Sequence, residues 1–492
     1  MKIKINEGFL GLKDNYLFSE VARRVRDYGS ANPEEEKRLI RLGIGDVTLP
    51  LAPCVVAAAR RATAEMGESE TFRGYAPERG YAFLLEAVAR RYASLGVSLD
   101  EDEIFISDGA KSDAGNIADI LGDSPVYIPD PVYPVYADSS ILAGRRVRMI
   151  EGTRENLFLP MPDGIAESGA VFFICSPNNP TGAVYSRKQL EKWVDFARET
   201  GSLIIYDSAY ESFIDGDFPH SIYEIDGAKQ CAVEICSLSK SAGFTGMRCA
   251  WTVVPSGLSA GDVSLNALWA RRQATKFNGV AYIIQRAAEA ALSDEGRAQC
   301  AEAIRIYKEN AHILSAPLDE KGIFYTGGRS SPYIWMRCPG GMRSWDFFDL
   351  LLEKAQIVGT PGEGFGSAGR GPTTLMSERS TLMNCGSSSR LSLRSHLPTR
   401  VIRGSSAILN TGPVFSLSSL RSASFSSAST HMLRNFSISN SRPFLPTRVC
   451  LKNTGPLGSS TFTKMAMMTN NQLSSTRTAA LNAKSKTRFT KR

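Results

Sequence analysis

The sequence has little of what defines several large classes of protein. Its 492 residues include four histidines, and its nine cysteines are scattered without a C-x-x-C pair. His220 and His312 are the only histidines before residue 378, too few and too isolated to predict a metal site. The odd, scattered cysteines indicate a reducing compartment rather than a disulfide framework.

Long apolar runs are also missing. No stretch of about 18 apolar residues exists, so we expect no membrane span, and the polar start at residues 1–7 lacks the apolar centre of a secretory signal. We therefore expect a cytoplasmic protein, or a plastid protein if the source is a plant or an alga.

Acidic residues are absent from the last part of the chain. Residues 379–492 contain 17 Lys and Arg and no Asp or Glu, whereas residues 1–378 carry 40 basic and 50 acidic groups. The net charge of +7 thus hides an acidic body, which argues against a nucleic-acid-binding surface there. We expect neither nucleic acid nor membrane as a partner.

The basic tail, 370–492, is rich in Ser, Thr and Arg and repeats the phrases LPTRV and NTGP. Such a composition cannot easily bury a core, so the tail is predicted to be disordered. The abrupt change near residue 370 also fits a frame shift, a mis-spliced exon or a gene-model error. A targeting function is the alternative, although organellar presequences lie at N-termini.

Short apolar runs alternate with helical patterns between about residues 100 and 255. This alternation predicts an α/β fold with a mostly parallel seven-stranded sheet. The expected strands are 104–106, 126–128, 147–150, 172–175, 203–206, 233–236 and 250–254. One connecting helix is clear, because Ser186 and Gln189 form a capping box and Gly201 stops it.

Residues outside this region predict a smaller α+β domain. This domain consists of residues 1–48, which form an N-terminal arm and part of the domain, and of residues 290–369. It includes a helix over 301–314 and a strand near 332–336. The large domain is then 49–289.

Polar residues cluster directly after four of the expected strands. The turns are 108–111, 178–182, 207–210 and 237–240. Because ligands of open α/β sheets bind at the carboxyl ends of the strands, four such turns predict one site at that edge.

Lys240 lies among Ser237, Ser239 and Ser241, eight residues before Arg248. A lysine can form a Schiff base with an aldehyde, and serine hydroxyls, backbone N–H groups and a guanidinium can bind a phosphate. Pyridoxal phosphate satisfies both requirements. Taken alone, the segment favours a solvated Lys and Arg in a Ser/Gly-rich loop, but it stands beside three other polar turns.

Other polar residues have matching candidate roles. Asp207 can keep the cofactor's ring nitrogen protonated, although an Asp in this position can also be a helix N-cap. Tyr210 and Asn179 can bond the phenolic oxygen. Tyr133 can stack on the ring or pack in the core. The start of the helix at Ala110 and Lys111 can seat the phosphate, and Lys240 can act as the base at the substrate's α-carbon.

Several motifs together resemble the fold-type I pyridoxal-phosphate aminotransferases and, within them, the L,L-diaminopimelate aminotransferase family. The resemblance covers about residues 1–369. Its motifs are residues 6–7, 15–20, 41–48, 72–75, 107–111, 130–136, 176–182, the Lys240 segment and 271–279.

The resemblance implies an activity and an assembly. The reaction is amino transfer between L,L-2,6-diaminopimelate with 2-oxoglutarate and tetrahydrodipicolinate with glutamate, on the route to lysine. A homodimer is implied, with Tyr75 and Asn278 reaching the site from the partner and Tyr75 touching cofactor and substrate. Tyr16 and Gly45 are implied substrate contacts.

Within the site, the resemblance gives substrate-binding roles to Lys111, Tyr133 and Asn179 as well. The alternatives are an aminotransferase for an aromatic or dicarboxylic amino acid, or a chain that holds the cofactor without turnover.

One family motif is missing. The family continues after the glycine-rich segment 364–369 with Phe-Arg-Leu-Thr, whose arginine grips the substrate's α-carboxylate. Here the corresponding place is near Thr374, and no such motif follows. Nothing in the context of Arg370 or Arg379 supports a replacement. We therefore expect the final strand and helix of the small domain to be lost and turnover to be impaired.

Overall fold

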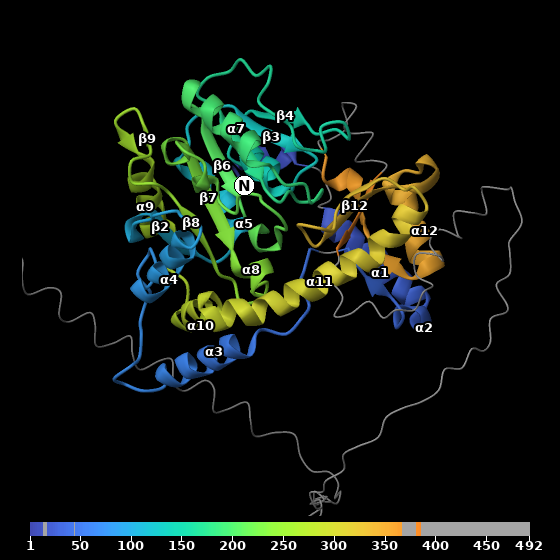
Figure 1. Ribbon diagram of the computed structural model, residues 1–492, viewed down its shortest axis with the longest axis horizontal. Coiled ribbons are helices and arrows are strands. Elements are labelled where there is room, and N and C mark those ends of the chain that lie inside the picture. The colour runs from blue at the N-terminus through green and yellow to red at the C-terminus, as the bar shows by residue number, and fades with distance from the viewer. Residues whose placement is uncertain (13–16, 44, 367–379, 385–492) are drawn as a thin grey trace, which may run out of the picture. The chain divides into compact units, whose positions relative to one another are not determined.

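The computed structural model describes residues 1–12, 17–43, 45–366 and 380–384. A seven-stranded sheet forms its centre, in the order β2-β8-β7-β6-β5-β3-β4 (Figure 1). The strands are β2 Ile104–Ser107, β3 Val126–Asp130, β4 Val147–Glu151, β5 Val171–Cys175, β6 Leu203–Asp207, β7 Ala232–Ser237 and β8 Ala250–Val253. Only β8 is antiparallel to its neighbours. The predicted mostly parallel α/β sheet is therefore confirmed.

Helices cover both faces of this sheet, so its central strands are mostly apolar; the buried Glu234 of β7 is an exception. One core contains residues of α3 Pro53–Glu65, α4 Ala82–Ala93, α7 Arg187–Glu199 and α10 Tyr282–Leu292. The opposite core contains residues of α5 Ala110–Asn116, α6 Val135–Leu142 and α9 Leu265–Lys276. In β5, Phe172 belongs to the first core and Phe173 to the second, as strand alternation requires.

The predicted capping box begins α7. The Ser186 hydroxyl accepts a bond from the N–H of Gln189, and the Gln189 side chain accepts one from the N–H of Ser186. The buried stripe is Leu190, Trp193, Val194 and Ala197. Gly201 follows with φ of +61°, a left-handed conformation that glycine adopts without strain.

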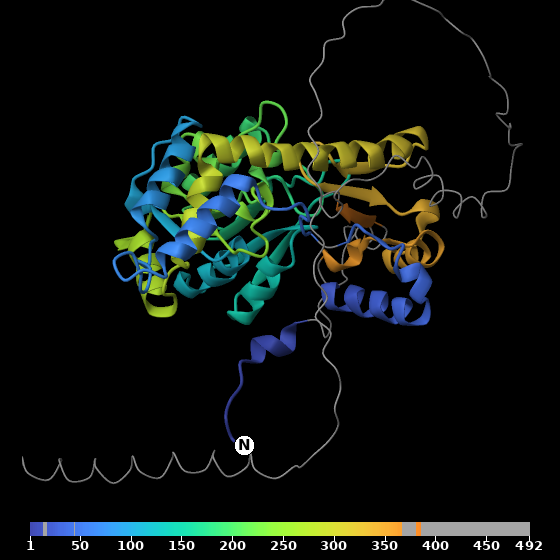
Figure 2. The same cartoon turned by 90° about the horizontal axis from the view of Figure 1, so that it is seen from below.

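A second sheet has the order β11-β12-β15-β14. Its strands are β11 Tyr325–Gly327, β12 Tyr333–Arg337, β14 Thr360–Pro361 and β15 Ser380–Asn384, and nearby β1 Ile40–Arg41 pairs with β13 Ile357–Val358. The helices of these parts of the chain are α1 Leu17–Ala31, α2 Pro33–Glu36, α11 Asp294–Glu320 and α12 Ser344–Ala355. Helix α11, yellow in Figures 1 and 2, runs from the central sheet to this second sheet. The domain boundaries drawn from the sequence stay a prediction.

Strand β15 differs from the expectation for the C-terminal segment. The sequence predicted that everything after residue 369 is disordered and that the small domain loses its last strand, yet 380–384 pairs with both β12 and β14. Backbone N–H and C=O groups alone can complete a ladder between two strands, whatever the composition of the segment. The prediction was wrong for these five residues, and the rest of 370–492 lies outside the described residues.

Two further findings concern the described part of the chain. No helix in it is long and apolar enough to cross a membrane. Its seven cysteines are all free thiols.

A buried carboxylate holds the turn that follows β6. Glu234 of β7 is 1% exposed. It accepts hydrogen bonds from the hydroxyls of Tyr92 (2.8 Å), Ser208 (3.0 Å) and Ser221 (2.6 Å) and from the N–H of Ile222 (3.1 Å). These four donors satisfy a group that is costly to bury. They also tie α4 to Ser208, the second residue of the turn.

The neighbouring residue of α4 binds the other end of the same turn. Arg91 Nη2 lies 2.6 Å from Glu211 Oε2, and His220 Nδ1 lies 3.0 Å from the same oxygen. Two consecutive residues of α4, Arg91 and Tyr92, thus fix the turn 207–211 from behind.

Replacing Glu234 by Gln should change how stability depends on pH. Burial raises the pKa of this carboxyl to about 7. Between its ordinary value near 4.5 and about 7 the folded chain holds a proton that the unfolded chain has lost, so the stability contributed by this group falls as pH rises. The free energy of unfolding, measured at about pH 5 and about pH 7.5, should therefore fall more for the wild type than for Glu234→Gln. The expected difference is on the order of 2 kcal/mol.

The matched control is Glu86→Gln on the exposed surface of α4, where Glu86 lies 3.5 Å from Arg90. It should track the wild type at both pH values. An equal pH dependence for the wild type and Glu234→Gln contradicts the assignment.

Candidate active site

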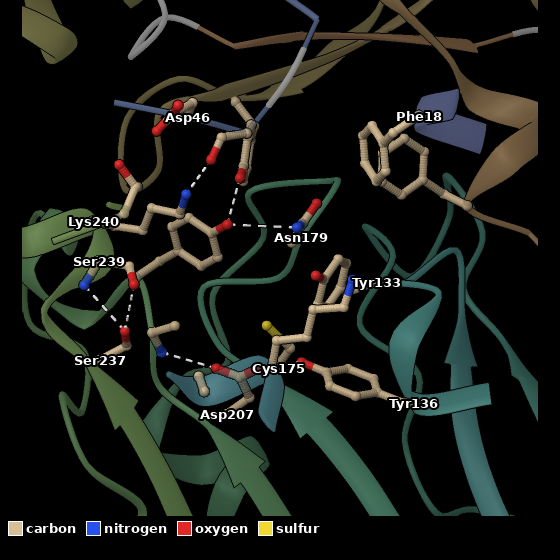
Figure 3. A pocket seen from close by; sticks show the side chains of 18 of the residues that line it. Phe18, Asp46, Tyr133, Tyr136, Cys175, Asn179, Asp207, Ser237, Ser239 and Lys240 are labelled. Carbon is tan, nitrogen blue, oxygen red and sulfur yellow. Dashed lines mark hydrogen bonds between the residues drawn. The ribbon is translucent and has the colours of Figure 1, made fainter. Parts of the chain in front are cut away.

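A cavity of about 410 Å³ opens at the carboxyl ends of the parallel strands (Figure 3). It is lined by Phe18, Gly45, Asp46, Ala110, Lys111, Tyr133, Tyr136, Cys175, Asn179, Asp207, Ala209, Tyr210, Ser237, Ser239, Lys240, Thr245, Arg248, Tyr333 and Phe365. All four polar turns singled out in the sequence contribute to it. Strands β2, β3, β5, β6 and β7 all end at this edge because they run in one direction.

Lys240 stands in α8, Leu238–Ser241, a single turn that begins at the end of β7. Its amine donates to the carbonyl of Gly45. Burial lowers the pKa of this amine to about 8, with Asp46 opposing the shift and Arg248 adding to it. An amine with this pKa is partly neutral near pH 7.5 and can therefore act as a nucleophile or a base.

Several hydrogen-bond donors line the same cavity as Lys240. The Ser237 hydroxyl accepts from the Ser239 N–H and donates to the Ser239 hydroxyl, at 3.0 Å in both cases. The Arg248 guanidinium donates to the carbonyl of Thr245 at 3.1 Å. Serine hydroxyls, backbone N–H groups at Ala110 and a guanidinium form a donor set that suits a phosphate.

Glycine at position 109 makes room for this guanidinium. Gly109 has φ of +143°, and a Cβ built there would stand 2.0 Å from Arg248 Nη2. Arg248 itself has φ of +65°, uncommon for a residue with a side chain. The backbone of Arg248 is thus held in a conformation that is unfavourable for a residue with a side chain, whereas Gly109 adopts its own without such strain.

Asp207 ends β6 and is 6% exposed. Tyr136 donates its hydroxyl to Oδ2 at 2.5 Å, and the N–H of Ala209 donates to Oδ1 at 3.0 Å. Burial raises the pKa of Asp207, and both hydrogen bonds oppose that shift by favouring the charged form. The carboxylate is therefore oriented on one side by a tyrosine and on the other by the backbone.

Tyr210 and Asn179 both line the cavity and are hydrogen-bonded to each other; Figure 3 labels Asn179. The amide nitrogen of Asn179 lies 3.5 Å from the Tyr210 hydroxyl, and Tyr210 also bonds the hydroxyl of Tyr333. The side-chain oxygen of Asn179 is buried and finds no hydrogen-bond partner in the described part of the chain. A buried amide oxygen without a partner indicates a place for a ligand.

The structure places the predicted site residues in three groups. Those that line the cavity are Gly45, Ala110, Lys111, Tyr133, Asn179, Asp207, Tyr210, Ser237, Ser239, Lys240 and Arg248. Tyr75, 87% exposed, and Asn278, also exposed, do not line it within one chain. Tyr16, Thr374, Arg370 and Arg379 lie outside the described residues.

Sequence analysis missed several residues of the cavity. They are Phe18, Asp46, Tyr136, Cys175, Ala209, Thr245, Tyr333 and Phe365. Tyr136 stands in segment 130–136, which was singled out, three residues after Tyr133 and in the first turn of α6. Tyr333 and Phe365 come from the second sheet and the segment after β14, so no local pattern links them to Lys240.

The fold and this site define a class of enzyme. Residues 37–382 match the family model described as aminotransferase class I and II, and the chain belongs to that family.

More particular similarities are to L,L-diaminopimelate aminotransferases. The curated one from Agathobacter rectalis is 49% identical over 384 residues, covering 75% of this chain and 94% of that protein. The one from Azobacteroides pseudotrichonymphae is 50% identical over 378 residues, covering 75% of this chain and 93% of that protein. The solved structure of L,L-diaminopimelate aminotransferase from Chlamydomonas reinhardtii has a TM-score of 0.74 and 38% identity, covering 83% of this chain and all of that one.

The family implies pyridoxal phosphate, and the residues of the cavity fit it. The unpartnered oxygen of Asn179 marks room for a ligand. The position of Arg248 against Gly109 suits a phosphate, and the buried Asp207 suits a protonated ring nitrogen.

Replacing Gly109 by Ala should weaken cofactor binding. The new methyl group would occupy the place of the guanidinium, so Arg248 must move away from the phosphate side of the cavity. Loss of one charge-assisted contact of about 2 kcal/mol predicts a rise in the dissociation constant of roughly 30-fold. Equilibrium titration of the apoprotein with pyridoxal phosphate, followed by absorbance, measures it.

The control is Gly201→Ala, which also puts a side chain at a positive φ but meets no neighbouring atom within 4 Å. It should lower the melting temperature without changing cofactor affinity. Equal affinities for the wild type and Gly109→Ala exclude the proposed role of Arg248.

Proposed function

We propose that this aminotransferase moves an amino group between L,L-2,6-diaminopimelate and 2-oxoglutarate, giving tetrahydrodipicolinate, glutamate and water. The observation that carries the proposal is the identity of 49% and 50% to two proteins of that name, over 94% and 93% of their lengths. The cavity adds chemical support, because it joins an amine of lowered pKa, a buried carboxylate and a phosphate-binding donor set.

The residues of the chain divide the work. When bound, pyridoxal phosphate supplies an aldehyde carbon and an electron-withdrawing ring that stabilises negative charge at the α-carbon of an amino acid. Asp207, oriented by Tyr136, would hold a proton at the ring nitrogen. Lys240, whose pKa is about 8, can take the α-proton and return it. Ser237, Ser239 and Arg248 would bind the phosphate.

The proposal includes a homodimer. Tyr75 and Asn278 are exposed in one chain and do not line its cavity, which is consistent with a role in the partner's site. A reducing, cytoplasmic location remains the expectation from the sequence.

A half-reaction distinguishes the substrate candidates. Loaded with pyridoxal phosphate and mixed with a single amino acid, the enzyme should lose the cofactor's absorbance band fastest with L,L-2,6-diaminopimelate. An aromatic and a dicarboxylic amino acid serve as competitors, and Lys240→Ala as the inactive control. Faster reaction with either competitor would falsify the substrate assignment.

Impaired turnover is a separate expectation. The Phe-Arg-Leu-Thr motif is absent from the sequence, and the place where its arginine would stand lies outside the described residues. In the described part of the chain, the Lys and Arg side chains that line the cavity are Lys111, Lys240 and Arg248. A lost carboxylate clamp costs roughly 3 to 5 kcal/mol.

The natural chain should be compared with a chimera whose residues after 369 come from the Agathobacter rectalis relative. We expect the half-reaction of the natural chain to be slower than that of the chimera by a factor of roughly 100 or more. Mass spectrometry of the purified C-terminus should accompany the rates. If mass spectrometry shows that the natural chain keeps its sequence after residue 369 and the two proteins react at equal rates, the loss of the substrate-carboxylate arginine does not impair turnover.

A further inference from the structure

Tyr333 connects the second sheet to the active-site cavity. It begins β12 of the second sheet, is 1% exposed, and lines the cavity. The Tyr333 backbone N–H donates to the hydroxyl of Ser331 at 3.2 Å, which fixes the start of the strand. A fully buried tyrosine hydroxyl needs a partner, and the one it has is a residue of the site.

That partner is Tyr210. The two hydroxyls are hydrogen-bonded, and the two rings meet edge to face with centroids 5.1 Å apart. Burial raises the pKa of both phenols, so both are neutral and each can donate one proton. If Tyr333 donates to Tyr210, the proton of Tyr210 stays available for another acceptor in the cavity.

Gly45 packs against the same hydroxyl. A Cβ built on Gly45 would lie 2.7 Å from the hydroxyl oxygen of Tyr333, but 3.7 Å from the ring carbon that carries it. The clash is therefore with the oxygen alone. Because the Gly45 carbonyl also accepts from Lys240, a shift of Gly45 would disturb the lysine.

We propose that Tyr333 is a positioning residue of the active site: it donates to Tyr210, directs the Tyr210 proton toward the cofactor's phenolic oxygen, and requires glycine at position 45. The proposal rests on pyridoxal phosphate binding in this cavity, and it does not depend on which amino acid is the substrate. It gives the second sheet a direct contact with the residues that tune the cofactor.

The first test removes the hydroxyl. Tyr333→Phe should leave Tyr210 a weaker donor, which destabilises the deprotonated form of the bound cofactor. The midpoint of the pH titration of cofactor absorbance should rise by about half a pH unit. Tyr185→Phe is the matched control, because Tyr185 is equally buried and donates to the Pro160 carbonyl at 2.8 Å outside the cavity. It should lower the melting temperature without moving the midpoint.

The second test uses the contact with Gly45. Gly45→Ala should weaken pyridoxal phosphate binding by roughly tenfold, because the methyl group clashes with the Tyr333 hydroxyl and thereby shifts the carbonyl that Lys240 contacts. The double variant Gly45→Ala with Tyr333→Phe should recover most of that affinity, since its methyl group meets only ordinary ring contacts. Such recovery is non-additive, which a general loss of stability does not produce.

The outcomes separate this proposal from the substrate assignment. An unchanged midpoint in Tyr333→Phe, or strictly additive losses in the double variant, overturns the role of Tyr333 even if L,L-2,6-diaminopimelate reacts fastest. A shifted midpoint with recovery in the double variant supports it even if another amino acid reacts faster.

Discussion

The site depends on one constraint, the common direction of β2, β3, β5, β6 and β7. Because these strands run the same way, their carboxyl ends lie at one edge, and each following turn supplies a polar group to the same cavity. Both faces of the sheet are covered by helices, so the strands are mostly apolar before their last residue, and Glu234 of β7 is held by four hydrogen bonds. The polar groups of the site therefore stand at the strand ends and in the segments that follow, where Asp207 and Lys240 line the same cavity.

Burial then sets the chemical character of these groups. Desolvation lowers the pKa of Lys240 to about 8 and raises that of Asp207. A raised pKa favours the neutral form of the Asp207 carboxyl. The hydroxyl of Tyr136 and the N–H of Ala209 counter it, while Glu234 and Arg91 hold the turn from behind. The polar network is thus arranged in two layers, one that touches the cavity and one that fixes the first.

Local patterns were sufficient for the central sheet and for most of the cavity. Each of the seven strands is an apolar run bounded by turn residues, and α7 carries a complete capping box, so neighbouring residues alone predict them. The turn residues could be assigned to one edge because strand direction follows from the βαβ alternation. Strand β15 was missed because its place depends on the backbone of β12 and β14, distant in sequence. Tyr333 was missed for a similar reason, since its hydroxyl is paired across 123 positions of the chain.

The sequence by itself determined the class of fold, and it identified Lys240 and most of the residues that line the cavity with it. Both predictions rest on hydrophobic periodicity and on turn residues, which are properties of neighbouring positions in the chain. Tertiary structure decided which groups are paired and what their ionisation is. Tyr136 on Asp207, Tyr333 on Tyr210 and the seat of Arg248 against Gly109 arise only when separate segments pack. Hydrogen bonding and desolvation act over a few ångströms of space, whatever the separation along the chain.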